Sequence, residues 1–322
     1  MTLVVAKRKG DVLALVSDTG VSLSGTQLGP EHHLPKICIL NGKLAVGFAG
    51  SPELGVTAIA SAPKDDGVTF GAVTKHFLDA HLKHDQGIEF ILAFGPPLSK
   101  LALVSGGKVT QNRTTEWIGD QAAFEAFQEF RQNRTPALSF VSTMLGTSRE
   151  GEAKLPTFDL IGTMGRVIER RDVSSVFGHA VGINNDGGQF DFRNYTVTLE
   201  EKPSFTMPAT ANPIEVLGQI AEARQFAFSC FVSSPEDALQ AVAFHYMRGR
   251  LTYVYYGAPG EVLNRFVLYK DMNVIEIGER AAAELGVNWI GGISSREGVP
   301  QGYGVPTDQW RILNPRPRPI PK

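Results

Sequence analysis

The sequence contains few cysteines, because Cys38 and Cys230 are the only two among 322 residues. Two cysteines are too few for a disulfide scaffold, which excludes the small secreted proteins that such bridges hold together. An excess of charge of one sign is also lacking. The formal net charge is −2, so no general attraction to nucleic acid or to anionic membranes is expected. We expect a cytoplasmic protein that binds neither nucleic acid nor a membrane.

Motifs of several other protein classes are absent. The charged run Lys7–Lys9 interrupts the apolar N-terminus, which is therefore neither a signal peptide nor a membrane-spanning segment. The sequence has no phosphate-binding loop and no dinucleotide-binding fingerprint, and we expect no cofactor. His76, His81 and His84 fall on one expected helix, but no cysteine or glutamate completes a ligand set. An exposed helix face is therefore favoured over a metal site.

The N-terminal residues predict a pair of apolar strands. Thr2–Lys7 and Val12–Asp18 flank a basic turn, and the second run is apolar on both faces, which is typical of strands that lie between two covering layers. A polar, glycine-containing loop follows over residues 19–35. It carries His32 and His33, which we expect to be solvated.

Further hairpins and helices alternate up to residue 198. Hairpins are predicted around Asn41–Gly42, around Gly95–Pro97, and over 176–197 with a turn at 185–188. Helices are predicted from Ser51, over 69–84, over 121–131 and over 158–170. This order permits two antiparallel sheets that face each other with helices outside. The predicted fold class is α+β, a four-layer αββα sandwich.

A change in composition suggests a domain boundary. Prolines cluster at 203, 208 and 213, so we divide the chain into residues 1–202 and 203–322. The second part is an additional α/β region, with helices predicted over 214–228, from Ser234 and over 273–285, and a strand over 250–256. Its proline-rich end, 315–322, is either a docking peptide or an extended terminus.

Six short segments follow one another at characteristic spacings through residues 2–198. They are Thr2-Leu3-Val4, Ser17-Asp18-Thr19, Lys36-Ile37, Phe48-Ala49-Gly50-Ser51, Phe90–Phe94 leading to Ile118-Gly119, and Arg171-Asp172-Val173-Ser174-Ser175. Asp18 lies sixteen positions after Thr2, and Gly50 lies fourteen positions after Lys36. In this order and spacing, the segments resemble a proteasome β-subunit of the N-terminal nucleophile hydrolase superfamily.

The first residues carry the chemistry that this resemblance implies. Methionine is usually trimmed before a small residue, and loss of Met1 would leave Thr2 with a hydroxyl and a free α-amine. Such a residue is a nucleophile with its own base. The resemblance implies that Thr2 is the nucleophile and that Asp18 pairs with Lys36. The Lys36 cation would lower the amine pKa from about 8 by like-charge repulsion.

The resemblance implies roles for further residues. The Gly50 N–H would stabilise the oxyanion, and Asp172 and Ser175 would orient the Thr2 amine. By position, the side chains that would line the pocket before the scissile bond are Val21, Cys38, Phe48 and Pro52. The bulk of Phe48 favours small or medium apolar substrate side chains. The alternative is that Phe48 packs in the core.

Some features depart from the family pattern. Asp120 stands where the family usually has serine after its Ile-Gly turn, the loop between Asp18 and Lys36 is two residues longer, and residues after 202 have no recognised counterpart. Taken singly, each site residue also fits an ordinary turn or strand-end role. If Met1 were retained, the amine would be blocked.

Three functions therefore stay open. The first is a threonine-type endopeptidase that cleaves peptides or unfolded proteins inside a homo-oligomeric ring, with any ATPase partner unknown. The second is a small-amide hydrolase on the same fold. The third is a catalytically inactive scaffold or interaction protein, which Asp120 and the C-terminal region favour.

Overall fold

The structure, a computed structural model, describes the chain in separate stretches. These are residues 2–23, 25–85, 87–111, 113–132, 138–140, 156–170, 172–186, 188–199, 227–246, 250–272, 274–290, 294–296 and 299–301. They fall into two compact units. The first draws on Met1–Thr135, Lys154–Arg193 and Tyr255–Phe266, and the second on Pro136–Ala153, Asn194–Val254 and Val267–Lys322. The boundary predicted after residue 202 lies in 200–226, outside the described residues, and stays a prediction.

The first unit contains an antiparallel sheet in the order β10-β1-β2-β12-β13. Its strands are β1 (Leu3–Lys9), β2 (Val12–Asp18), β10 (Thr115–Gly119), β12 (Ala180–Asn184) and β13 (Asp191–Phe192). The predicted N-terminal strand pair is confirmed, with Val5 opposite Val16. The chain reverses between them at Gly10, whose φ of +62° is a conformation that glycine adopts without steric cost.

A second antiparallel sheet of the first unit has the order β5-β6-β7-β8-β9. Its strands are β5 (Ile37–Asn41), β6 (Leu44–Gly50), β7 (Ile88–Phe94), β8 (Lys100–Ser105) and β9 (Lys108–Gln111). The predicted hairpins at Asn41–Gly42 and Gly95–Pro97 are confirmed, and they join β5 to β6 and β7 to β8. The loop between β2 and β5 carries β3 (Ser22–Leu23), β4 (Thr26–Gln27) and the 3-10 helix η1 (Pro30–His32).

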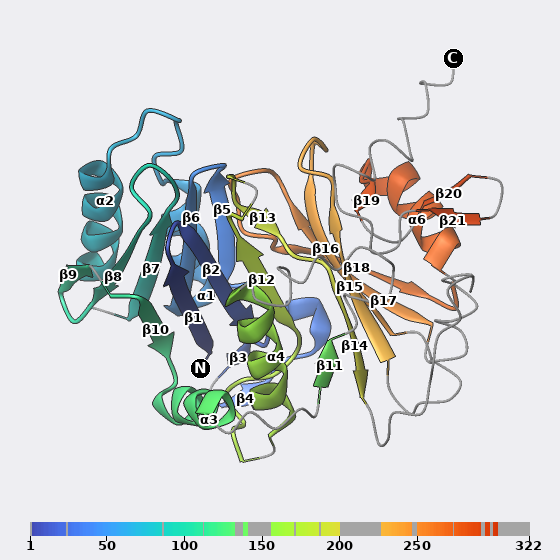
Figure 1. Cartoon of the computed structure of the whole chain (residues 1–322), viewed down its shortest axis with the longest axis horizontal. Coiled ribbons are helices and arrows are strands. Elements are labelled where there is room, and N and C mark those ends of the chain that lie inside the picture. The colour runs from blue at the N-terminus through green and yellow to red at the C-terminus, as the bar shows by residue number, and fades with distance from the viewer. Residues whose placement is uncertain are drawn as a thin grey trace. The chain divides into compact units, whose positions relative to one another are not determined.

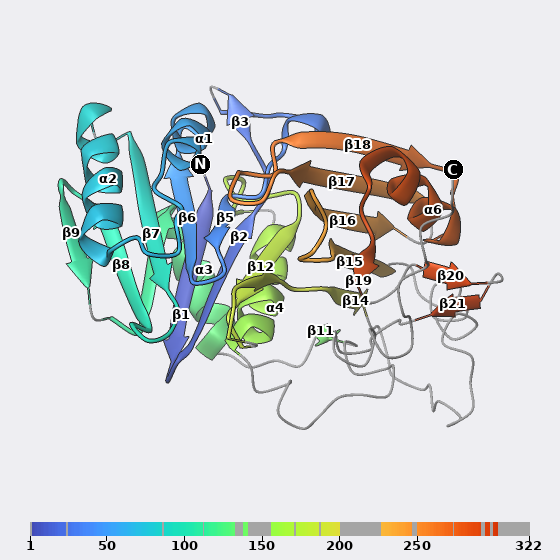
Figure 2. The same cartoon turned by 90° about the horizontal axis from the view of Figure 1, so that it is seen from above.

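Helices pack against both sheets of the first unit (Figures 1 and 2). They are α1 (Pro52–Ala60), α2 (Phe70–Lys83), α3 (Gln121–Gln132) and α4 (Pro156–Glu169), close to the predicted ranges. Helices α1 and α2 contact β6, β7 and β8, whereas α4 contacts β1, β2 and β12 and packs beside α3. Strand β1 also contacts β6, β7 and β8 of the other sheet. Strands of the two sheets therefore contact each other, and helices pack on both sheets.

The hairpin predicted over 176–197 is shorter than expected. Strand β12 pairs with β13, but the following strand β14 (Tyr195–Leu199) pairs with β15 of another sheet. After the turn, the Phe190 N–H donates to the Gly42 carbonyl at 2.9 Å, and this bond directs the chain towards the β5–β6 hairpin. Only two residues of β13 therefore remain beside β12.

The second unit is built on a seven-stranded sheet in the order β11-β14-β15-β16-β17-β18, with β19 beside β15. Its further elements are β11 (Leu138–Phe140), β15 (Ala227–Ser233), β16 (Gln240–Tyr246), β17 (Leu251–Gly257), β18 (Arg265–Lys270), β19 (Trp289–Ile290), β20 (Ser294–Arg296), β21 (Val299–Gln301) and α6 (Val274–Leu285). The segment from Tyr255 in β17 to Phe266 in β18 belongs to the first unit.

Two predictions for the second unit differ from the structure. The helix predicted over 214–228 lies mostly outside the described residues, and its last residues instead begin β15. The helix predicted from Ser234 is wrong, because Ser234 starts a tight turn between β15 and β16. That connection is too short for a helix, and Asp237 accepts the Asn288 N–H at 2.7 Å instead of capping one. The strand and the helix predicted over 250–256 and 273–285 are confirmed as β17 and α6.

Among the described residues, no helix is both long enough and apolar enough to cross a membrane.

Candidate active site

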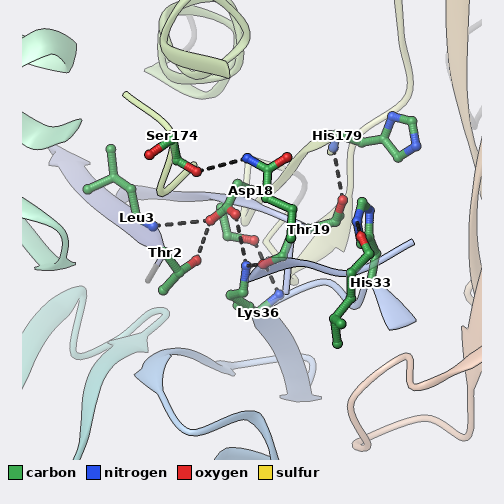
Figure 3. A network of polar contacts seen from close by, with 12 residues as sticks. Thr2, Leu3, Asp18, Thr19, His33, Lys36, Ser174 and His179 are labelled. Carbon is green, nitrogen blue, oxygen red and sulfur yellow. Dashed lines mark hydrogen bonds and ion pairs between the residues drawn. The ribbon is translucent and has the colours of Figure 1, made fainter. Parts of the chain in front are cut away.

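Pairing of the first two strands sets the position of Thr2. Strand β1 starts directly after it, and the antiparallel register places Val4 opposite Ser17. Continued by one residue, this register brings Asp18, the last residue of β2, opposite Leu3 and next to Thr2. Lys36 precedes β5 in the other sheet, and its backbone N–H donates to the Ser17 hydroxyl at 3.3 Å. Segments far apart in the sequence thus meet at one end of the two sheets (Figure 3).

Hydrogen bonds in this cluster converge on the Asp18 carboxylate. The Thr2 hydroxyl donates to Asp18 Oδ1, and the Leu3 N–H donates to the same oxygen at 3.1 Å. The Lys36 ammonium lies 2.9 Å from Asp18 Oδ2 and also donates to the Gly20 carbonyl. The exposed fraction is 3% for Thr2, 0% for Asp18 and 3% for Lys36. The three side chains form one buried line from hydroxyl to carboxylate to ammonium (Figure 3).

Burial governs the electrostatics of this line. It lowers the pKa of Lys36, and the neighbouring Asp18 carboxylate opposes that change. A buried charge is costly unless a partner and hydrogen bonds compensate for it, and here each charged group provides them for the other. The line fixes the direction of the Thr2 hydroxyl and places the Lys36 cation close to it. This arrangement suits activation of a hydroxyl nucleophile.

A glycine turn fixes the backbone of Thr2. The Asp120 N–H donates to the Thr2 carbonyl at 2.8 Å. At the preceding residue, Gly119, φ is +105° and a Cβ atom would lie only 2.0 Å from the Thr2 carbonyl oxygen, so a larger residue does not fit. Asp120 Oδ1 accepts the Ala123 N–H at 2.8 Å and so caps helix α3. Asp120, noted in the sequence as a departure, therefore has a structural task.

Gly50, the expected oxyanion donor, ends strand β6. Its φ is +112°, and a Cβ atom there would lie 2.3 Å from the Gly87 carbonyl oxygen. Only glycine fits at position 50, because any side chain would clash with the Gly87 carbonyl oxygen. Its role towards an oxyanion stays a prediction.

The structure does not join Asp172 and Ser175 to Thr2. The Asp172 carboxylate pairs with Arg170 at 2.5 and 2.8 Å, and 65% of its side chain is exposed. That pairing lowers the pKa of Asp172. In the part of the chain that the structure describes, neither residue forms a hydrogen bond with Thr2. The roles predicted for both residues stay predictions.

The residues expected to line a substrate pocket lie in or beside the core. Cys38 and Phe48 are each 1% exposed, and Val21 packs against the same cluster. Burial raises the pKa of the Cys38 thiol to about 12. Helix α1 begins at Pro52 and packs on Phe48, since a Cβ atom at Gly55 would lie 2.4 Å from the Phe48 ring. Phe48 thus packs in the core, which was the alternative expected from the sequence. The substrate pocket stays a prediction.

The histidines of α2 bind backbone groups. His81 is fully buried, contrary to the exposed face expected for it. Its Nδ1 bonds to the Ile88 carbonyl at 2.5 Å, and its Nε2 accepts the Gly107 N–H at 3.0 Å. His76 bonds to the Ala58 carbonyl at 2.8 Å. Within the described stretches, no group of three or more histidine, cysteine, aspartate or glutamate residues could hold a metal ion.

The sequence did not reveal a second buried cluster next to Asp18. His33 was expected to be solvated, but only 9% of it is exposed, because its ring contacts Phe177 and bonds to Leu28. His179 is 6% exposed, and burial lowers its pKa to about 3. Its backbone N–H donates to the Thr19 hydroxyl at 2.8 Å. The position of His33 three residues before Lys36 was the one available sequence signal.

The comparisons with known proteins found solved structures that resemble this chain, but no similar curated sequence. No protein-family model and no curated protein sequence matches the chain. Eukaryotic HslV from Trypanosoma brucei is 16% identical, with a TM-score of 0.37, over 57% of this chain and 98% of HslV. BPH from Thiobacillus denitrificans is 15% identical, with a TM-score of 0.39, over 57% of this chain and 97% of BPH.

Proposed function

We propose that this chain is an N-terminal threonine hydrolase that cleaves peptide bonds after removal of Met1. The observation that supports the proposal is the buried line of the Thr2 hydroxyl, the Asp18 carboxylate and the Lys36 ammonium. A buried hydroxyl could bond to any backbone carbonyl. Here it bonds to a carboxylate that is itself paired with a buried cation, so the hydroxyl is held in one direction beside a fixed positive charge.

In this mechanism, Thr2 Oγ1 bonds to the carbonyl carbon of the substrate while the freed Thr2 amine accepts the hydroxyl proton. The Gly50 N–H stabilises the resulting oxyanion. For Asp172 and Ser175 to orient the amine, Asp172 would have to leave its ion pair with Arg170. The carbon–nitrogen bond then breaks, and the same proton passes to the departing amine. A water molecule then attacks the acyl carbon of the ester while the Thr2 amine takes its proton. The bond from that carbon to Thr2 Oγ1 breaks, and the amine returns the proton to Oγ1, which releases the acid product. Lys36 keeps the amine neutral through like-charge repulsion, and Asp18 holds Lys36 in place.

The proposal extends to the fold and the assembly. The two facing sheets with their outer helices would be the four-layer αββα sandwich of the N-terminal nucleophile hydrolases. Residues 1–202 would supply that domain, and residues 203–322 would form the additional region. A cytoplasmic homo-oligomeric ring would restrict the site to peptides and unfolded chains, with small or medium apolar side chains beside Val21, Cys38, Phe48 and Pro52.

A second candidate is a non-catalytic scaffold with the same fold. Two observations favour it: Thr2 is only 3% exposed, and Asp172 faces solvent in an ion pair with Arg170. A hydrolase of small amides would share the chemistry of the first candidate and differ only in substrate.

The test starts with the intact mass of the purified protein and of a Thr2→Ala variant. Alanine is also small enough for methionine removal, so both proteins should lack Met1 and differ only in the hydroxyl. Hydrolysis of fluorogenic peptides should disappear in Thr2→Ala, persist in Thr2→Ser, and be unchanged in Thr114→Ala, which alters an exposed threonine. Equal turnover by the wild type and Thr2→Ala would reject the hydrolase, and hydrolysis of small amides alone would select the alternative substrate class.

A further inference from the structure

One buried imidazole beside the Asp18–Lys36 pair has a nitrogen without a hydrogen-bond partner. His33 Nε2 lies 3.0 Å from the Leu28 carbonyl oxygen. A carbonyl only accepts, so Nε2 must carry the proton, and Nδ1 of the neutral ring is left with a lone pair. Nδ1 is buried and has no hydrogen-bond partner in the described part of the chain. The ring is therefore held in one tautomer with an unused base.

Close packing fixes this ring in place. The His33 and Phe177 rings pack in a T-shaped arrangement, with a centroid distance of 5.3 Å and an interplanar angle of 75°. Gly178 has a φ of +84°, and a Cβ atom there would lie 2.9 Å from His33 Nδ1 and 2.5 Å from the Thr19 hydroxyl oxygen. The absence of a side chain at residue 178 leaves space for the His33 ring, which lies close to Thr19 and Lys36 (Figure 3).

The backbone on either side of His33 is tied to the residues around Asp18. The Leu34 N–H donates to the Thr19 carbonyl at 3.0 Å, and the Lys36 N–H donates to the Ser17 hydroxyl at 3.3 Å. The two segments that supply Asp18 and Lys36 therefore run side by side. The bond from the His33 ring to the Leu28 carbonyl ties this paired segment to the middle of the loop over residues 19–35.

We propose that His33 is a positioning residue for the Asp18–Lys36 pair, and that only its neutral form can act in this way. A proton on Nδ1 would place a second buried cation near the Lys36 ammonium with no acceptor to compensate for it. Buried charges without partners are not tolerated, so the ring would leave its site and the loop before Lys36 would move with it. This inference rests on the proposed hydrolase function.

The charged groups around the ring set the direction of the pH effect. Burial lowers the pKa of His33 below 6.5, and the Lys36 cation lowers it further, whereas the Leu28 bond and the Asp18 and Glu31 carboxylates oppose this change. The neighbouring ring of His179 is also held neutral by burial. The folded protein therefore protonates His33 at a lower pH than the unfolded chain does. The contribution to stability is complete above about pH 6.5 and is lost as the pH falls to the folded pKa.

Three variants of the full-length protein separate positioning from titration. His33→Gln keeps a donor for the Leu28 carbonyl and removes the titrating base. His33→Leu removes both. His32→Gln is the matched control, because the neighbouring His32 side chain is 59% exposed. Peptide turnover is measured from pH 4 to 8 for each protein, together with the NMR titration of the imidazole and lysine ammonium signals.

We expect His33→Leu to lower kcat about 10- to 100-fold with little change in KM, because the site is displaced and His33 does not touch substrate. The loss should be smaller in His33→Gln, and that variant should lose the acid-limb inflection that the wild type and His32→Gln share. Full kcat in His33→Leu, or an unchanged acid limb in His33→Gln, would overturn the proposal.

The NMR arm keeps this test separate from the proposed function. If no peptide is cleaved by the wild type, the hydrolase fails. The positioning role is then judged by whether the Lys36 signal shifts as His33 titrates in the wild type and no longer shifts in His33→Gln. A Lys36 signal that ignores the protonation of His33 would reject the coupling between the two residues.

Discussion

Asp18 is the residue on which the site depends, because three donors converge on its two oxygens. They are the Thr2 hydroxyl, the Leu3 N–H and the Lys36 ammonium. Hydrogen bonds to a charged group each contribute about 1.5–3 kcal/mol. The same carboxylate therefore orients the nucleophile, holds the start of β1 and compensates the buried ammonium.

Replacing Asp18 by Asn should damage both stability and activity. The change leaves the Lys36 ammonium buried without its counter-ion, and removing one partner of such a pair costs about 3–5 kcal/mol. Urea unfolding followed by fluorescence gives this loss directly, and peptide hydrolysis should fall to background in the same variant.

A double variant separates the two effects. In Asp18→Asn combined with Lys36→Met no buried charge remains, so most of the lost stability should return while hydrolysis stays absent. If the double variant were as unstable as the single one, the ion pair would not be the source of the loss.

Gly119 controls Thr2 by its lack of a side chain. Gly119→Ala should displace the Thr2 carbonyl, since the added Cβ would lie 2.0 Å from that oxygen in a backbone conformation with φ of +105°. We expect a loss of about 1–3 kcal/mol or more and a reduced kcat. Gly25→Ala is the control, because its φ of +84° is also positive but nothing lies within 4 Å. Equal losses in the two variants would mean that backbone strain, not contact with Thr2, is the cause.

At the scale of elements, helix α3 is joined to the site through its first turn. Asp120 caps α3 with its carboxylate and binds the Thr2 carbonyl with its backbone N–H. The helix start and the nucleophile therefore share one residue, so a change in either should affect the other.

Two substitutions of Asp120 distinguish its cap from its charge. Asp120→Ala should cost about 0.5–2 kcal/mol, because the helix loses its N-cap. Asp120→Ser should keep most of that stability, since serine also caps helices. Removing the carboxylate beside Thr2 should lower the pKa of the freed amine, so hydrolysis by Asp120→Ser should persist to lower pH than in the wild type. Thermal unfolding and a pH–rate profile measure the two effects, and an unshifted profile would show that the charge does not reach the amine.

The strands and helices were largely predictable, because their apolar periodicity is local. The residues of β1 and β2 are buried runs on either side of a turn, and the structure places them within one or two positions of the prediction. The failures have non-local causes. Strand β14 leaves its expected partner for β15, and Ser234 enters a turn that two neighbouring strands make too short for a helix.

The same distinction applies to the site. Thr2, Asp18 and Lys36 follow from the order and spacing of short segments, and the structure brings them together. The burial of His33 was not predictable, because it depends on Phe177 and Gly178, which reach the loop only through the pairing of β12 with β2. The exposed side chain of Asp172 likewise depends on Arg170, a partner that the segment pattern does not identify.

For the whole molecule, the first unit is discontinuous in sequence. Tyr255, which is fully buried, donates its hydroxyl to the Pro30 carbonyl at 3.1 Å and lies 6.3 Å from the His179 ring, so the loop before Lys36 rests partly on a residue from the last third of the chain.

A chain shortened to residues 1–202 should therefore be less stable than the full-length protein. Loss of a buried aromatic side chain typically costs about 3–5 kcal/mol, and β14 also loses its partner β15. Thermal unfolding and the hydrogen-exchange protection of residues 30–36 measure the effect. Tyr255→Phe in the full-length chain is the control, because it removes only the hydroxyl. Native-like protection in the shortened chain would show that residues 1–202 form an independent domain.

The two buried cysteines can report when each unit of the protein unfolds. Cys38 lies in the first unit and Cys230 in the second, with exposed fractions of 1% and 2%. Burial raises the pKa of both thiols, so neither forms the reactive thiolate in the closed state. An alkylating reagent added in mild denaturant will label each thiol only when its own unit opens. Peptide mapping of the label then orders the two opening events without any added probe.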